Sequence, residues 1–275
     1  MINIELKDCD FEKIRKLVYE QCGINLHEGK RELVKARLGK RLREGCYKSF
    51  SDYCRYVTTK DGTGELIAMI DSISTNLTSF FREESHFIRL RMIISAILEK
   101  EGLRRSPYQF NLWSAGCSTG EEPYSLAITI KESAGLRPFD VKITATDIST
   151  KVLRIAETAV YQEEKVKCIA TPVLRKYFQV GTGRSAGLYR IKKDIKDMIE
   201  FRRFNLMDEF SCAAKFDIVF CRNVMIYFDK KTQNSLIDKF YESLKAGGYF
   251  FVGHSESLTG LKHQFKYVEP SVYQK

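Results

Sequence analysis

NLWSAGCSTGEEPYS, residues 111–125 of the 275-residue chain, joins an apolar run to a helix through a turn bracketed by two glycines. Glycine lets a backbone approach a bound molecule closely, and the amides of a new helix's first turn lack intrahelical partners. The turn therefore predicts a ligand site. Glu121 and Glu122 stand at the start of that helix, where they would repel a pyrophosphate. We expect a ligand that carries hydroxyls, an ammonium or another positive centre.

Strands are expected to alternate with helices around this turn. The apolar segments that predict strands are residues 110–115, 141–146, 200–206, 216–221 and 249–253. Such alternation implies an α/β fold, in which helices cover both faces of a mainly parallel sheet. The glycines of residues 181–187, followed by the segment 188–191, indicate a small antiparallel insertion between a helix and the next strand.

Residues 1–72 show only helical periodicity. Apolar residues recur there at helical spacing, as at Phe11, Ile14 and Val18. We therefore expect a helical N-terminal domain in residues 1–72, a linker in 73–88 and an α/β domain in 89–275, with the β-subdomain inserted at about 172–198. With 275 residues and 44% hydrophobic content, the chain can bury a full core.

Composition argues against several classes of protein. No apolar run approaches the ~20 residues that a membrane span requires, and the N-terminus lacks a signal-peptide core. The cytoplasm is therefore the expected compartment. The eight cysteines form no CxxC pair, and several lie among apolar residues, so we interpret them as reduced and mostly buried thiols rather than metal ligands.

The net charge of +10 is unevenly placed, since residues 30–48 hold eight basic side chains against two acids. Val34, Leu38 and Leu42 recur there at a spacing of four, which predicts a helix with one apolar stripe and a basic remainder. Such a surface is either a solvated helix face or a docking site for an acidic protein helix or for nucleic acid. Both interpretations stay open at this level.

Polar residues follow the predicted strands. In parallel sheets, ligands bind outside the carboxyl ends of the strands. The second strand ends at Asp147, an acid of the kind that accepts hydrogen bonds from ribose hydroxyls. The next strand has Asn205 near its end, and the fourth strand is followed by Arg222 and Asn223. Each residue alone could be a cap or turn residue, but together with the glycine turn they favour a shared site.

Three ligand classes compete for this site. Residues 116–120, GCSTG, match the GxSxG elbow of α/β-hydrolases with His254 as a base, but the helical region upstream supplies no strand for an oxyanion loop. A nicotinamide dinucleotide would suit Asp147, yet the GxGxxG fingerprint is absent and the acid pair disfavours a pyrophosphate. S-adenosylmethionine fits better, because it has a ribose, an ammonium and a sulfonium and carries no phosphate.

Five strings stand out along the chain, namely TNLTSFFR (75–82), AGCSTGEEPYS (115–125), ATDI (145–148), FCRNVMIYF (220–228) and GHSES (253–257). By these strings and their order, the chain resembles the chemotaxis receptor methyltransferases, the CheR family. This resemblance implies a Rossmann-like S-adenosylmethionine-dependent methyltransferase domain with a small inserted antiparallel β-subdomain. An all-α N-terminal domain that docks the substrate would precede it. The division agrees with the one that periodicity indicates.

By the same resemblance, the substrate is a glutamate side chain on the cytoplasmic helices of chemotaxis receptors. The cofactor would leave as S-adenosylhomocysteine, without a metal. The family's cofactor contacts fall on Asn76, Thr78, Arg82, Glu122, Asp147, Asn205, Leu206, Arg222 and Asn223. Thr78 or Ser79 could also cap a following helix, and we expect Phe80 and Phe81 to be core anchors. A monomer is expected, without membrane insertion or a nucleic-acid partner.

Methylation of a carboxylate demands little of the protein, since glutamate is already ionised near neutral pH and needs no general base. Much of the rate can come from proximity, worth up to ~7–11 kcal/mol in favourable cases, and from exclusion of water. Arg82 is the candidate for orienting carboxylates. Tyr227 is the candidate for positioning the substrate, although it could simply pack beside Phe228. We interpret His254 as structural and expect Cys117 to react with thiol reagents if the empty site is open.

The resemblance also gives the basic helix a role, because receptor methylation regions are helical and acidic. We expect charge reversal at Arg37, Lys40 and Arg41 to raise the KM for the receptor at low ionic strength without changing the affinity for S-adenosylmethionine. Residues 181–187 resemble the family segment that, in some members, captures a receptor's C-terminal pentapeptide by edge-strand addition. The sequence leaves open whether this chain does so.

Two other functions stay open. A nucleic-acid methyltransferase would use the basic helix on phosphates, although the chain lacks the Asn/Asp-Pro-Pro-Tyr/Phe motif common in such enzymes. A non-catalytic sensor of S-adenosylmethionine would keep the pocket without transferring a methyl group.

Overall fold

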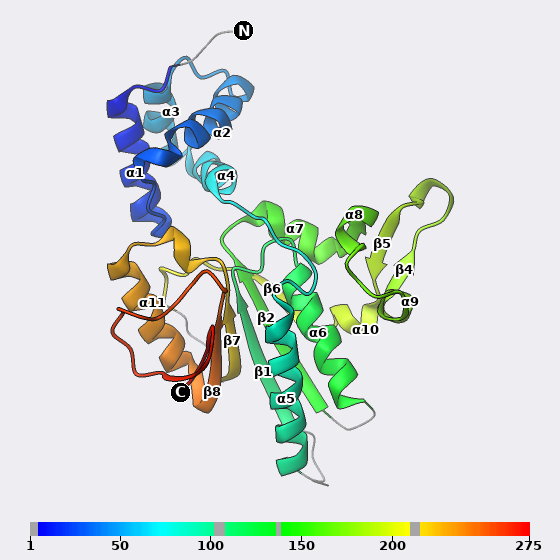
Figure 1. The fold of residues 1–275 in the computed structure, drawn as a ribbon. Coiled ribbons are helices and arrows are strands. Elements are labelled where there is room, and N and C mark those ends of the chain that lie inside the picture. The colour runs from blue at the N-terminus through cyan, green and yellow to red at the C-terminus, as the bar shows by residue number, and fades with distance from the viewer. Residues whose placement is uncertain (1–4, 102–107, 136–138, 210–214) are drawn as a thin grey trace.

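The computed structural model describes residues 5–101, 108–135, 139–209 and 215–275. Its N-terminal part consists of helices α1 (Asp8–Cys22), α2 (Arg31–Glu44), α3 (Phe50–Val57) and α4 (Thr63–Ile73), with a short 3-10 turn, η1 (Glu28–Lys30), before α2. These helices form a separate group beyond the carboxyl ends of the strands (Figure 1). The expected all-α N-terminal domain is confirmed.

The core of this helical domain is formed by one face of each helix. The stripe Val34, Leu38 and Leu42 of α2 is fully buried, as the spacing of four predicts. It packs in one cluster with Phe11 of α1 and Met69 of α4. The basic side chains of α2 therefore lie on its other faces.

The main sheet has seven strands. They are β1 (Tyr108–Ala115), β2 (Phe139–Asp147), β6 (Ile199–Arg203), β7 (Phe216–Cys221), β8 (Leu244–Val252), β9 (Lys266–Glu269) and β10 (Val272–Gln274). Their order is β6-β2-β1-β7-β8-β10-β9, and every pairing is parallel except those that β10 makes with β8 and β9. The mainly parallel sheet expected from the alternation is confirmed.

Both faces of the sheet are covered by helices, as expected. Side chains alternate along β1, so Phe110 and Leu112 belong to the core under α5 (Glu84–Glu101) and α6 (Glu121–Ala134). Trp113 and Ala115 point the other way, into the core under α11 (Lys230–Ser243). In Figure 1, α5 and α6 accordingly lie on one side of the strands and α11 on the other.

A second, three-stranded antiparallel sheet projects beside the main one (Figure 1). Its order is β3-β5-β4, formed by β3 (Val160–Gln162), β4 (Phe178–Val180) and β5 (Leu188–Ile191). The short helices α8 (Glu163–Val166), α9 (Thr171–Tyr177) and α10 (Lys193–Lys196) and the turn η2 (Gly183–Ser185) connect it. The β-subdomain thus includes residues 160–162, upstream of the expected 172–198, because α7 (Thr150–Thr158) leads directly into an edge strand.

Two expectations from composition bear on the described residues. Among them, no helix is long and apolar enough to cross a bilayer. All seven cysteines that the structure describes are unbridged, with Cys9, Cys46 and Cys168 exposed and four others buried. The eighth, Cys212, lies outside the described residues.

Candidate functional site

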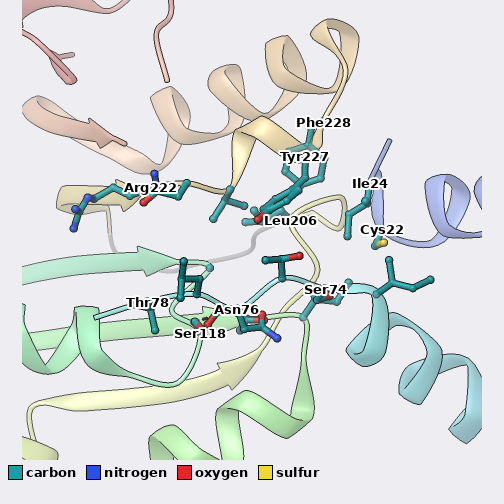
Figure 2. Close-up of a pocket in the computed structure, with 18 of the residues that line it drawn as sticks. Cys22, Ile24, Ser74, Asn76, Thr78, Ser118, Leu206, Arg222, Tyr227 and Phe228 are labelled. Carbon is teal, nitrogen blue, oxygen red and sulfur yellow. Dashed lines mark hydrogen bonds between the residues drawn. The ribbon is translucent and has the colours of Figure 1, made fainter. Parts of the chain in front are cut away.

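A pocket opens at the centre of the sheet, where the strand order reverses. The first strand in the chain, β1, lies between β2 and β7, so the carboxyl ends of these three strands share one edge. The empty space there, counted out to solvent, is about 1240 Å³. All nine predicted cofactor contacts and Tyr227 line this pocket, whereas Arg37, Lys40 and Arg41 do not. The predicted contacts come from opposite walls, with Asn76 and Thr78 facing Arg222 and Tyr227 across the pocket (Figure 2).

The glycine turn (residues 116–120) forms the floor of the pocket next to β1. Gly116 has φ 84° and Gly120 has φ 95°, values in the left-handed region that side chains other than glycine rarely adopt. A Cβ at Gly116 would also overlap Val224, and one at Gly120 would come within 2.9 Å of Ala156. The glycines are thus required by the turn itself and by its neighbours, and Gly116 also lines the pocket.

The two acids after the turn have different environments. Glu122 lines the pocket, where Ser114 Oγ donates to its Oε1 at 2.7 Å and Arg222 Nη1 donates to its Oε2 at 3.2 Å. Burial raises the pKa of Glu122, and Arg222 only partly opposes this. Glu121 points away from the pocket lining, is fully buried and pairs with Lys165 at 3.1 Å. Only one of the two acids therefore faces the ligand site.

Asp147 ends β2 and is bound by the glycine turn. Ser118 N donates to its Oδ2 and Ser149 N to its Oδ1, each at 2.9 Å. Burial raises the pKa of Asp147, and these backbone hydrogen bonds oppose the increase. Each carboxylate oxygen has two lone pairs, so Asp147 retains acceptor capacity for hydroxyls in the pocket.

An irregular segment between the two domains, residues 74–83, forms the facing wall of the pocket, and we call it the strap. Its backbone is held by side chains from elsewhere. Ser118 Oγ donates to the carbonyl of Asn76 at 3.1 Å, and Phe81 N donates to Ser125 Oγ at 3.0 Å. Within the strap, Arg82 Nη1 donates to the carbonyl of Leu77 at 3.0 Å.

The alternative that Thr78 or Ser79 caps a helix is not what the structure shows. Helix α5 begins at Glu84, and both residues line the pocket instead. Phe80 is buried against Tyr161 of the β-subdomain, and the ring of Phe81 packs at its edge on Phe87, so both phenylalanines are core anchors as expected.

Arg222 fastens the end of the strap. Its Nη2 donates to the carbonyl of Arg82 at 2.5 Å, and the same guanidinium pairs with Glu83 at 3.0 Å and with Glu122 at 3.2 Å. Burial alone would raise the pKa of Glu83, but Arg222 and the amide of His254 outweigh it, so the pKa is lowered. Arg222 was predicted as a cofactor contact, and its position gives it an additional, structural role.

The loop after β7 carries Asn223 and Tyr227. Asn223 has φ 58°, and its backbone N–H donates to Glu256 Oε2 at 2.7 Å. The amides of Gly253 and Ile226 donate to the same carboxylate, at 2.7 and 3.2 Å. Glu256 therefore fixes this loop from a distant part of the chain, a role that sequence reasoning missed because the string GHSES (253–257) does not show which backbone groups the glutamate binds.

The helical domain also reaches the pocket, which the sequence did not indicate. Asn25 and Lys30 line it, and Asn25 N donates to the carbonyl of Tyr227 at 2.8 Å. Asn205 Nδ2 donates to the carbonyl of Gln21 at 2.7 Å. The pocket is thus shared between the two domains, and Lys30 is a cation at its edge that could not be singled out among eight basic residues.

The three residues predicted for docking have unequal surroundings. Arg41 pairs with Glu65 at 2.5 Å, and Arg37 Nη1 donates to backbone carbonyls at the end of α4. Lys40 is the most exposed, with 76% of its side chain accessible and Glu44 3.9 Å away. Docking by these residues stays a prediction, which Lys40 fits best.

Among the described residues, Glu83, His86 and His254 place their ligand atoms within 4.8 Å of one another. The group is poorly suited to a cation, because the guanidinium of Arg222 lies 3.0 Å from Glu83 and would repel it. His86 is buried, and burial together with Arg222 lowers its pKa to about 3, so it is neutral. His254 Nε2 lies 3.0 Å from Ser85 Oγ, which fits the structural role expected for it.

The expectation that Cys117 reacts with thiol reagents is not supported by its surroundings. The side chain is 1% exposed and does not line the pocket. Burial and the nearby Asp147 raise the pKa of the thiol well above its ordinary value, which suppresses the reactive thiolate.

Comparison with known proteins places these features in a family. The family model for the CheR methyltransferase S-adenosylmethionine-binding domain matches residues 76–274, and that for the CheR all-alpha domain matches residues 10–74. A chemotaxis protein methyltransferase of Borreliella burgdorferi is 40% identical over 100% of this chain and 96% of its own length. The one from Escherichia coli is 38% identical over 98% of this chain and 92% of its own length.

Proposed function

The chain belongs to the CheR methyltransferase family, and on that premise we propose that it methylates glutamate side chains on the cytoplasmic helices of chemotaxis receptors. The methyl donor is S-adenosylmethionine, and the products are glutamate methyl esters and S-adenosylhomocysteine. The observation that carries the proposal is a pair of carboxylates that line the pocket at the reversal of the strand order, namely Asp147, which is buried, and Glu122, whose side chain is 12% exposed.

The residues present fit this cofactor. Asp147 has acceptor capacity for ribose hydroxyls at the end of β2, and Glu122 contributes negative charge near the glycine turn. Arg222 is neutralised by Glu83 and Glu122, so it does not provide an anion site for a pyrophosphate. Asn76 and Thr78 on the strap would contact the same molecule from the facing wall.

The chain's own residues orient the acceptor and exclude water. S-adenosylmethionine supplies a methyl group on a sulfonium centre when it is bound. The acceptor glutamate is ionised near neutral pH, so no side chain has to remove a proton. Arg82 would orient carboxylates, and the hydroxyl of Tyr227, in the wall opposite the strap, would position the acceptor. The helical domain closes the pocket through Asn25 and Lys30.

The partner is an acidic receptor helix that docks on the basic surface of α2. Lys40 is exposed there and would attract acidic side chains over about one Debye length, roughly 10 Å at moderate ionic strength. Capture of a receptor pentapeptide would use the β-subdomain, in which β4 is an edge strand with Val180 exposed. A titration with such a peptide that shows no binding would exclude this tether.

The decisive assay incubates the full chain with S-adenosylmethionine labelled in its methyl group and with receptor cytoplasmic fragments. We expect label on the receptor that is released as methanol by mild base, because esters are base-labile and amides are not. The matched control is a receptor fragment whose methylation-region glutamates are replaced by glutamine. Label on nucleic acid, base-stable label, or cofactor binding without transfer would each contradict the proposal.

A further inference from the structure

Helix α4 ends at the strap without a glycine cap. The amide of Ser74 makes the last helical bond, to Ile70, and Ser74 then turns to φ −58° and ψ 139°. The final carbonyls of a helix have no intrahelical donor. Here Nη1 of Arg37, from α2, donates to the carbonyls of Ile73 at 2.7 Å, Ser74 at 2.9 Å and Ser72 at 3.4 Å. One guanidinium thus replaces the missing cap.

The charge of Arg37 suits this position as well. A cation stabilises the carbonyl end of a helix, and the last turn of α4 contains no basic residue of its own. Arg37 is half-buried, so water screens this interaction less than it would at the surface. All of these contacts are made by Nη1, so its two N–H groups are shared among several acceptors.

The contact continues into the strap. Nη1 of Arg37 lies 3.3 Å from Oγ1 of Thr75, and the next residue is Asn76, whose carbonyl is bonded to Ser118 of the glycine turn. Asn76 is therefore fixed from both sides, by the helical domain before it and by the α/β domain after it. Its side chain lines the pocket.

We propose that Arg37 is a positioning residue that holds the strap in the conformation that binds S-adenosylmethionine, although it does not line the pocket itself. The inference rests on the proposed function of that pocket. It also separates Arg37 from Lys40. A residue that only docks the receptor changes the KM for the receptor, whereas a residue that positions the strap changes cofactor affinity with no receptor present.

The test is a calorimetric titration of S-adenosylhomocysteine into the full-length wild type, Arg37→Ala, Arg37→Lys and Arg43→Ala. Apparent affinity falls in proportion to the fraction of molecules in the competent conformation, so we expect the Kd to rise on the order of tenfold for Arg37→Ala. Arg37→Lys should lie between this variant and the wild type. Arg43 is exposed on the same helix, and its alanine variant should stay within about twofold of the wild type.

A second variant separates positioning from loss of stability. Leu42→Ala leaves a cavity in the core of the helical domain and should lower the melting temperature without touching the strap. If Leu42→Ala raises the Kd as much as Arg37→Ala at equal or greater loss of melting temperature, the inference is wrong. Steady-state assays provide a further criterion, since Arg37→Ala should raise the KM for S-adenosylmethionine more than the KM for the receptor.

The failures of the two proposals are distinguishable. A wild type that does not bind S-adenosylhomocysteine contradicts the proposed function. A wild type that binds it and an Arg37→Ala variant that binds it equally well contradict only the inference about Arg37.

Discussion

The glycine turn and the strap face each other across the same pocket but are built in different ways. The amides of Gly116 and Cys117 both donate to the carbonyl of Thr146 on the neighbouring strand, at 2.8 and 2.9 Å. The turn is thus an extension of the sheet. The strap has no regular structure and depends on side chains from several other regions, among them Arg37, Ser118 and Arg222. We expect the turn to be in place without ligand and the strap to be the part that long-range contacts can loosen.

The largest effect should come from Arg222→Ala, which removes the contacts that hold the strap at Arg82 and Glu83. The change removes a buried guanidinium and leaves Glu83 and Glu122, each with 12% of its side chain exposed, without their cation. Removing one partner of a buried ion pair costs about 3–5 kcal/mol, so the free energy of unfolding should fall by that amount in denaturant titrations. Methyl transfer should fall at least about 100-fold in the fraction that remains folded.

Arg202→Ala is the matched control for Arg222→Ala. It removes an arginine whose ion pair with Glu200 is exposed, so its cost should be at most about 1 kcal/mol. Equal unfolding free energies for the two variants would show that Arg222 does not fasten the strap.

Asp147→Asn should weaken the turn side of the pocket alone. The variant loses the charge that accepts hydrogen bonds from Ser118 N and Ser149 N and, in our proposal, from the ribose. Hydrogen bonds to charged groups contribute about 1.5–3 kcal/mol, so the Kd for S-adenosylhomocysteine should rise by about 10- to 100-fold in calorimetry. An unchanged Kd would show that Asp147 does not bind the ribose.

Acidification should also affect the two regions differently. Burial raises the pKa of Glu122 and Asp147, so these carboxylates are protonated as the pH falls through values above the ordinary range of about 4. Cofactor affinity, measured by calorimetry from about pH 8 to about pH 5, should therefore decline before ordinary carboxylates titrate.

The pKa of Glu83, in the strap, is shifted in the opposite direction from those of Glu122 and Asp147. Its pKa is lowered, so the stability it contributes is present above its unfolded pKa and is lost only as the pH falls through the lower, folded value. Glu122 and Asp147, whose pKa values are raised, instead lower the stability of the fold at neutral pH, and this effect disappears as they are protonated.

A cofactor affinity that is constant down to pH 4 would contradict the assignment of Glu122 and Asp147 to the cofactor site.

The smallest effect should come from Lys40→Glu, which leaves both regions of the pocket intact. We expect the KM for the receptor to rise about two- to fivefold at low salt, to approach the wild-type value at high salt, and the Kd for S-adenosylhomocysteine to stay unchanged. The triple charge reversal that includes Arg37 and Arg41 is less informative, because those side chains bond within the helical domain. A change in cofactor affinity for Lys40→Glu would contradict a role in docking alone.

The turn side of the site could be predicted from sequence because its residues are positioned by the strands that they follow. Asp147, Arg222 and Asn223 follow parallel strands, and the carboxyl ends of such strands meet at one edge. Helical periodicity likewise predicted the buried stripe of α2. The distinction between Glu121 and Glu122 could not be made, since adjacent helical residues point about 100° apart and only the placement of α6 decides which one faces the pocket.

The strap side was predictable only through family resemblance. That resemblance indicated Asn76 and Thr78 but not Arg37, whose contact with Thr75 joins parts of the chain that are far apart in sequence. Glu256, which fixes the loop after β7, was missed for the same reason. A basic residue in an amphipathic helix indicates an exposed face, and nothing local shows that Arg37 caps another helix. Sequence reasoning therefore found the residues that follow strands, including Arg222, and missed Arg37 and Glu256, whose partners lie far away in the sequence.

Amide hydrogen exchange with and without S-adenosylhomocysteine tests the central claim most directly, because it reports on both walls of the pocket at once. We predict that residues 116–120 exchange slowly even in the free protein, and that residues 75–82 exchange faster when free and become protected when the ligand binds. Exchange in the strap that is unaffected by saturating ligand would contradict the claim that turn and strap together form one cofactor site.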